Sequence, residues 1–293
     1  YIMLKIDPIT LSVVRGTLET TQREMTLALE KTSRSSVLNL ARDYSTTIFN
    51  STPEMILQGQ DIPIHLGSFM PAMKAVADFF GEDIHEGDLI LHNDPAYQGS
   101  HIVDMCMYRP VFYKEKHVFW TACKGHLTDA GGPVPASYNP EATEIFAEGL
   151  RIPPIKLWDK GKSRDDILNM VLTNMRARRN QEGDFRALIG SCQVGERNLI
   201  NMLDKYGLDE VNLCIDELLS MADRHMRSLI KEIPDGSYSG TAILEDAGHG
   251  LGDMEITANL TIKDDACDIG IISPPQVPYF IRSEEHTSEL QSQ

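Results

Sequence analysis

Two apolar, strand-prone runs separated by a short charged segment impose the strongest constraint on how this chain can fold. The runs cover residues 102–113 and 117–126, and residues 114–116 between them read Lys-Glu-Lys. Runs of this length and composition predict β-strands, and so short a polar connection predicts that the two strands pair as an antiparallel hairpin. A further buried strand is predicted just upstream, at residues 88–92, where an Asn-Asp-Pro sequence ends it.

Helical periodicity flanks this β-rich segment on both sides. An Asp-Pro pair at positions 7 and 8 is a typical helix start, and apolar residues then recur on one helical face through Leu29. Because strands and helices do not alternate regularly, the sequence predicts an α+β fold, a mixed α/β arrangement in which an antiparallel hairpin or sheet packs with several helices; an irregular α/β fold is the alternative. Further helices are predicted at about 69–80, 164–180, 184–203 and 209–231, a loop at 129–143, and strands at 238–246 and 254–262.

Charge and composition exclude several functional classes. The 293 residues include 27 Lys and Arg against 43 Asp and Glu, which gives a net charge of −16. Nucleic acid is therefore not expected as a partner, since phosphate binding requires a basic surface. The five cysteines are widely spaced and show no C-x-x-C pair, and no run of about 20 apolar residues marks a membrane helix. The sequence predicts a cytoplasmic protein without membrane contact.

The hairpin also brings candidate metal ligands together. A three-residue turn would pair Tyr113 with His117, and the same register places Asp104 directly opposite His126. Opposed side chains lie about 5 Å apart on one sheet face, which suits two ligands of one ion. His101, at the strand entrance, is a candidate third ligand, because two imidazoles and a carboxylate often hold a catalytic divalent metal. Surface or hydrogen-bonding roles stay open, since a one-residue register shift would reverse His126.

Longer motifs connect the chain to a known family. Residues 93–104 read N-D-P-A-Y-Q-G-S-H-I-V-D, and residues 141–157 read E-A-T-E-I-F-A-E-G-L-R-I-P-P-I-K-L. Both resemble segments of the hydantoinase B/oxoprolinase family, and shorter matches follow the same order at 41–45, 61–67 and 174–187. The resemblance extends over about residues 5–260.

This resemblance implies a division of labour between two chains. Family members work with a hydantoinase A-like subunit or domain that uses ATP to activate a carbonyl, whereas the B-type chain holds a divalent metal ion, with zinc and manganese as the expected ions. In this sequence the metal ligands map onto His101, Asp104 and His126. Asp43 is implied as an additional ligand or a catalytic carboxylate. The sequence itself has no complete phosphate-binding loop, which agrees with ATP binding on a partner in a hetero-oligomer.

Other residues of the matched motifs are weaker candidates. Asp129, three residues after His126, is a candidate for orienting a ligand or acting as a base, or it caps the glycine-rich turn that follows. Glu144, Glu148 and Arg151 either line a substrate channel or form a structural ion network. His65 is a site candidate or a packing histidine.

Three functions are consistent with these residues. The favoured one is the metal-dependent catalytic subunit of an ATP-dependent cyclic amide hydrolase, which opens a hydantoin, 5-oxoproline or lactam ring. The second is the large subunit of an ATP-dependent acetone or acetophenone carboxylase, and the third is a scaffold for the ATP-binding subunit. The preserved metal set disfavours the scaffold, but the sequence does not separate the first two.

The C-terminal residues lose the apolar pattern. Residues 282–293 resemble translated adapter sequence, so we expect a non-native tail there. Residues 1–281 are expected to be the N-terminal part of a truncated hydantoinase B-like catalytic domain.

Overall fold

The structure is a computed structural model, and it describes residues 6–245 and 250–275. These residues fall into two compact units, one formed by residues up to 139 together with 145–214, the other by residues 140–144 together with those from 215 onward. None of the helices in the described ranges is long and apolar enough to cross a membrane. The expected tail at 282–293 lies outside the described residues.

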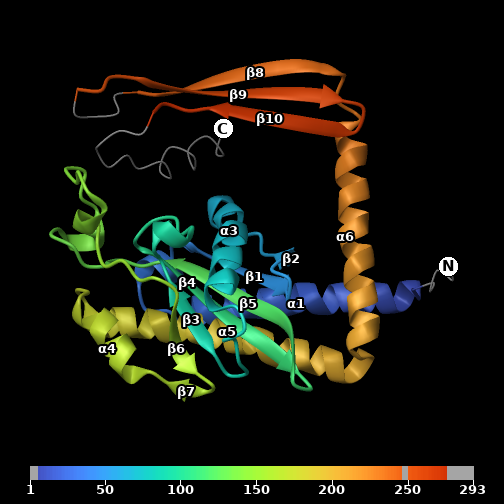
Figure 1. Cartoon of the computed structure of the whole chain (residues 1–293), viewed down its shortest axis with the longest axis horizontal. Coiled ribbons are helices and arrows are strands. Elements are labelled where there is room, and N and C mark those ends of the chain that lie inside the picture. Colours follow the sequence, from blue (N-terminus) through green and yellow to red (C-terminus); the bar gives the residue numbers. More distant parts are fainter. Residues whose placement is uncertain (1–5, 246–249, 276–293) are drawn as a thin grey trace. The chain divides into compact units, whose positions relative to one another are not determined.

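A seven-stranded sheet forms the centre of the first unit (Figure 1). Every neighbouring pair of strands is antiparallel, which confirms the predicted α+β class and excludes the irregular α/β alternative. The strands lie in the order β2-β1-β5-β4-β3-β6-β7. Their bounds are β1 Tyr44–Asn50, β2 Met55–Gln58, β3 Leu89–His92, β4 Asp104–Tyr113, β5 Lys116–His126, β6 Ile155–Asp159 and β7 Lys162–Ser163.

Helices cover both faces of this sheet, with α1 and α5 on one side and α3 on the other (Figure 1). Asp7 caps α1 by accepting a hydrogen bond from the Thr10 backbone N–H, as the Asp-Pro start predicts. The helices are α1 Pro8–Thr32, α2 Ser36–Asn39, α3 Pro63–Phe80, α4 Asp165–Thr173, α5 Arg178–Tyr206 and α6 Leu208–Ile230, with single 3₁₀ turns η1 at Pro95–Tyr97, η2 at Pro135–Ser137 and η3 at Ile145–Ala147.

Side-chain alternation along β4 divides the core into two layers. Met105 and Met107 pack in the cluster beneath α5, whereas Cys106 and Tyr108 pack with Phe69 of α3. Even-numbered residues of β4 therefore face α3, because successive side chains of a strand point to opposite faces. Both layers are fully buried, so the register of this strand is strongly specified.

The hairpin differs from its predicted form at the turn but not at the other end. The predicted three-residue turn is wrong, because Lys114 and Glu115 alone make it, both with positive φ (48° and 66°). Positive φ at both turn residues is typical of two-residue hairpin turns, whose backbone twist matches that of the paired strands. A β-bulge at Val118, which has no paired residue on β4, then compensates for the shorter turn. Asp104 consequently pairs with His126, which confirms the predicted register.

The second unit contains a three-stranded antiparallel sheet in the order β10-β9-β8. Its pairing places apolar residues together on one face, among them Ile256, Ile269 and Ile271, and the last two are 59% and 68% exposed. The opposite face carries mostly Ser, Thr, Asn and acidic residues. The strands are β8 Gly236–Leu244, β9 Met254–Lys263 and β10 Ala266–Ile272.

Candidate functional site

The candidate site lies on the α3 face of the sheet, where β4 and β5 meet the loop before them. Asp104 opens β4 and faces His126 at the end of β5. On the other flank of β5, the His126 backbone N–H donates to the Asp43 carbonyl at 3.0 Å, which continues the β1–β5 pairing by one residue. His126 therefore lies between two aspartates, Asp104 on β4 and Asp43 just before β1.

The Asp104 carboxylate is the hub of this cluster. It is fully buried, and it accepts hydrogen bonds from His126 Nδ1 at 2.9 Å and from His101 Nδ1 at 3.2 Å. The Ser100 hydroxyl donates to the same carboxylate at 2.6 Å. Burial opposes ionisation of Asp104, but the bonds from His101 and His126 outweigh it and hold the pKa of this carboxyl well below its usual range. The three predicted metal ligands are thus in direct contact.

A tightly tethered loop brings His101 to the hub. The Asn93 amide donates to the carbonyls of Ile102 and Leu150, and its oxygen accepts from the Ile152 N–H at 2.7 Å. Asp94 begins the η1 turn that follows. Because buried hydrogen bonds hold both ends of the loop, the fold determines the position of His101.

The first turn of α3 adds a third histidine to the cluster. Pro63 starts this helix six residues before the predicted position, so His65 enters the helix and points toward the sheet. Its Nε2 lies 3.5 Å from Asp43 Oδ1, and the other Asp43 oxygen lies 3.9 Å from His126 Nδ1. Asp43 is 31% exposed, so it is more accessible than the buried Asp104.

A buried lysine, which the sequence analysis does not identify, completes the site. Lys124 lies two residues before His126 on β5, on the same face, and its side chain is fully buried. The Nζ atom donates to the hydroxyls of Ser68 on α3 and Ser100 in the loop. The only signal for it in the sequence is an apolar strand that carries a charged residue at an inward position.

Asp129 holds a loop in this structure. Its Oδ2 accepts from the Gly131 N–H at 3.1 Å and from the Arg176 N–H at 2.8 Å, while Oδ1 accepts from the Arg176 guanidinium at 2.9 Å. These contacts match the capping alternative for the glycine-rich turn. A catalytic role for Asp129 stays a prediction.

Two of the other motif residues also have defined surroundings. The Arg151 guanidinium donates to both oxygens of Asp94, so it supports the loop before His101. Burial raises the pKa of Glu148, and the neighbouring charge of His101 partly offsets that rise. Glu148 therefore lies within electrostatic reach of the site, whereas Glu144 is exposed.

The chemistry of the donor set fits a divalent metal ion. Two imidazoles and one carboxylate already touch, and a second carboxylate and a third imidazole lie beside them. Within the described ranges, no group of three or more His, Cys, Asp or Glu side chains is arranged as a ready-made cage. The imidazoles bond to the Asp104 oxygens instead, so metal binding would exchange these hydrogen bonds for metal–ligand bonds.

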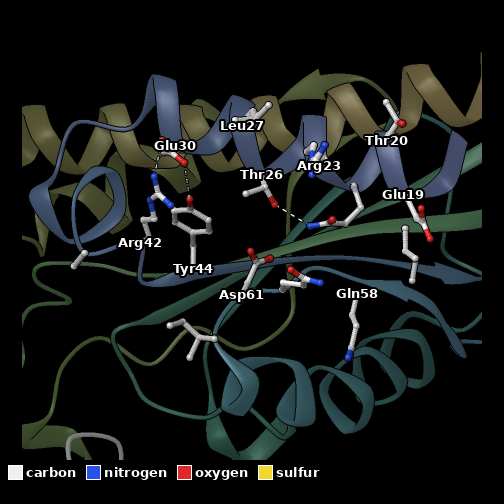
Figure 2. Close-up of a pocket in the computed structure, with 15 residues that line it drawn as sticks. Glu19, Thr20, Arg23, Thr26, Leu27, Glu30, Arg42, Tyr44, Gln58 and Asp61 are labelled. Carbon is white, nitrogen blue, oxygen red and sulfur yellow. Dashed lines mark hydrogen bonds and ion pairs between the residues drawn. The ribbon is translucent and has the colours of Figure 1, made fainter. Parts of the chain in front are cut away.

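A separate pocket of about 740 Å³ lies between α1 and strands β1 and β2 (Figure 2). In this pocket Glu30 is bound by Arg42 at 3.7 Å and by the Tyr44 hydroxyl at 3.2 Å, and both contacts are drawn in Figure 2. Burial and the Glu30 carboxylate raise the pKa of Tyr44 to about 12. None of the predicted site residues lines this pocket. Asp43 comes directly before the lining residue Tyr44, but its side chain turns to the opposite face of the sheet.

His92 makes the stability of the fold sensitive to acid. Burial lowers its pKa to about 4; the Lys124 charge adds to this effect, and Asp94 opposes it. The unfolded chain takes up this proton near pH 6.5, so stability is complete above that pH and is lost as pH falls toward 4. Urea unfolding between pH 7 and 4 should show wild type losing roughly 3 kcal/mol more than His92→Gln. Parallel pH curves for the two proteins would contradict this assignment.

Comparison with known proteins shows the family to which the chain belongs. Residues 7–289 match the hydantoinase B/oxoprolinase family, so the chain belongs to that family. It is 69% identical over 281 residues to caprolactamase subunit beta of Pseudomonas jessenii, which covers 96% of this chain and 48% of that protein. It is 32% identical over 167 residues to the acetophenone carboxylase delta subunit of Aromatoleum aromaticum, covering 57% of this chain and 24% of that one.

A solved structure shows the same architecture. The crystal structure of the ATP-dependent caprolactamase from Pseudomonas jessenii superimposes with a TM-score of 0.90 at 69% identity, over 94% of this chain and 48% of that one. The chain therefore spans less than half of each of these relatives.

Proposed function

We propose that this chain is part of the catalytic subunit of an ATP-dependent cyclic amide hydrolase, with a lactam as the substrate class. The contact of His101, Asp104 and His126 in one cluster is the observation that carries the proposal. The substrate class rests on the 69% identity to a caprolactamase subunit, which is far above the identity to the carboxylase subunit and extends over far more of the chain.

His101, Asp104 and His126 would hold a divalent ion, zinc or manganese, with Asp43 as a further carboxylate beside His126. Such an ion, when bound, polarises a carbonyl or lowers the pKa of a bound water. The chain's own residues supply the rest of the site. Asp43 is the more exposed of the two carboxylates, so it is suited to accept a proton from the attacking water.

The ATP chemistry belongs, in this proposal, to a hydantoinase A-like partner subunit in a cytoplasmic hetero-oligomer. The partner transfers a phosphoryl group from ATP to the amide oxygen, and water then adds to the activated carbon. Cleavage of the C–N bond and loss of phosphate leave an amino acid, ADP and phosphate. The buried, sheet-mounted cluster would position the water-activating groups.

One experiment separates the hydrolase from the carboxylase. The full-length subunit with its partner is incubated with ATP, ¹⁴C-bicarbonate and either caprolactam or acetophenone. We expect ring opening that depends on ATP, with no label in the product. Label fixed in the product, or ketone carboxylation without lactam hydrolysis, would favour the carboxylase instead.

A further inference from the structure

We propose that Lys124 is a positioning residue that orders the site through Ser100. This inference rests on the proposed metal site, but its geometry concerns only residues of this chain. Lys124 is fully buried, and its ammonium lies 5.3 Å from the centre of the Phe69 ring. Burial of an ammonium costs several kcal/mol unless its partners offset that cost, so its place beside the cluster requires a reason.

The hydrogen bonds around Lys124 have only one possible direction. An ammonium group donates and never accepts, so Ser100 Oγ must accept from Lys124 Nζ at 2.9 Å. The single hydroxyl proton of Ser100 then goes to Asp104 Oδ2, at 2.6 Å. Lys124 thereby fixes which way Ser100 points and holds one Asp104 oxygen in place.

The second hydroxyl bound to Lys124 is ordered in the same way. Ser68 Oγ accepts from Lys124 Nζ and donates to the His65 carbonyl at 2.9 Å. A single ammonium group thus joins three segments: the loop that carries His101, the strand that carries His126, and the helical turn that carries His65. We infer that removing this charge loosens the arrangement of the ligands before it affects the rest of the fold.

The test compares Lys124→Met and Ser100→Ala with the double variant, each in the full-length subunit with its partner. Zinc affinity is measured by chelator competition, and KM and kcat are measured for lactam and ATP. Each single variant should bind zinc 10- to 100-fold more weakly. The zinc affinity of the double variant should be no lower than that of the single variant that binds zinc more weakly, because both changes break the same chain of contacts. The kcat should fall while both KM values stay within about twofold.

Lys156→Met is the matched control. Lys156 is also largely buried, but its ion pairs are with Asp83, Asp88 and Asp159, at 3.1 Å, 3.0 Å and 3.9 Å. We expect this variant to lose stability while its zinc affinity stays within about twofold of wild type. Ser100→Thr, which keeps the hydroxyl, should restore zinc affinity relative to Ser100→Ala.

The possible outcomes separate this inference from the proposed function. Unchanged zinc affinity in Ser100→Ala, or losses that simply add in the double variant, would overturn the role of Lys124. If Lys124→Met fails to fold, Ser100→Ala still decides the matter. If the wild type binds no zinc or manganese, the proposed metal site fails. In that case, a crystal structure of the Ser100→Ala complex tests this inference. Loss of the contact between His101 and Asp104 would support it, and an unchanged contact would overturn it.

Discussion

Replacing His126 by alanine should reduce kcat/KM for ATP-dependent lactam hydrolysis by roughly 10³-fold or more, as losses of essential catalytic groups do. His126 contacts both carboxylates of the cluster, Asp104 at 2.9 Å and Asp43 at 3.9 Å. Its removal takes away a proposed metal ligand and leaves the buried Asp104 with one imidazole partner fewer. Metal content and steady-state kinetics of the full-length complex would measure both effects.

His117 provides a matched control on the same strand. It lies at the opposite end of β5, where its ring stacks on Phe112 and its Nε2 donates to the Phe119 carbonyl. His117→Ala removes a partly buried imidazole without touching the cluster, so we expect lower stability with kcat/KM within about twofold. A His126→Ala enzyme that keeps its metal and most of its activity would exclude the metal-site proposal and favour the scaffold function.

The contact between Asp104 and His126 was predictable because a hairpin is a local structure. Its register depends on the turn and on the inward pattern of the two strands, and a buried face tolerates no one-residue shift. The turn itself was not predictable in detail. A two-residue turn and the bulge at Val118 compensate each other, and strand composition alone does not reveal such a bulge.

The positions of Asp43 and His65 depend on long-range packing and were less accessible. Strand β1 is rich in Ser and Thr yet almost entirely buried, so its sequence lacks the apolar signal of a central strand. Only its pairing with β5 places Asp43 beside His126. Helix α3 contains Pro71 and Gly67, which obscure its first turns, and Pro63 at its start is the better indication of where it begins.

Lys124 illustrates why a buried charge is hard to assign from sequence. Its spacing from His126 shows that the two residues share a face, but not which residues cover that face. Ser68 and Ser100 come from a helix and a loop far apart in the chain. The second unit shows the same limit. The sequence predicts β8 and β9, whereas the edge strand β10 is recognised only from its pairing with β9 in the structure.

A second large effect is expected from Gly99→Ala, which alters the backbone that delivers His101. A Cβ at position 99 would lie well inside van der Waals contact of the Asn93 carbonyl and the Asp94 backbone. Neither residue can move easily. Asn93 donates hydrogen bonds to the carbonyls of Ile102 and Leu150, and Arg151 holds the Asp94 carboxylate. The loop must therefore shift, and Ser100 and His101 shift with it.

We expect Gly99→Ala to weaken zinc binding about 100-fold, at the upper end of what lost supporting contacts cause. Its stability cost should stay within about 1–3 kcal/mol, as for other overpacked positions. Gly16→Ala on α1 is the control, because nothing lies within 4 Å of its added Cβ, and alanine in a helix should raise stability slightly. Equal zinc affinity in the two variants would show that the loop backbone does not position His101. Weak binding in Gly99→Ala alone would show that the position of His101, two residues after Gly99, depends on the close approach of Gly99 to the Asn93 backbone.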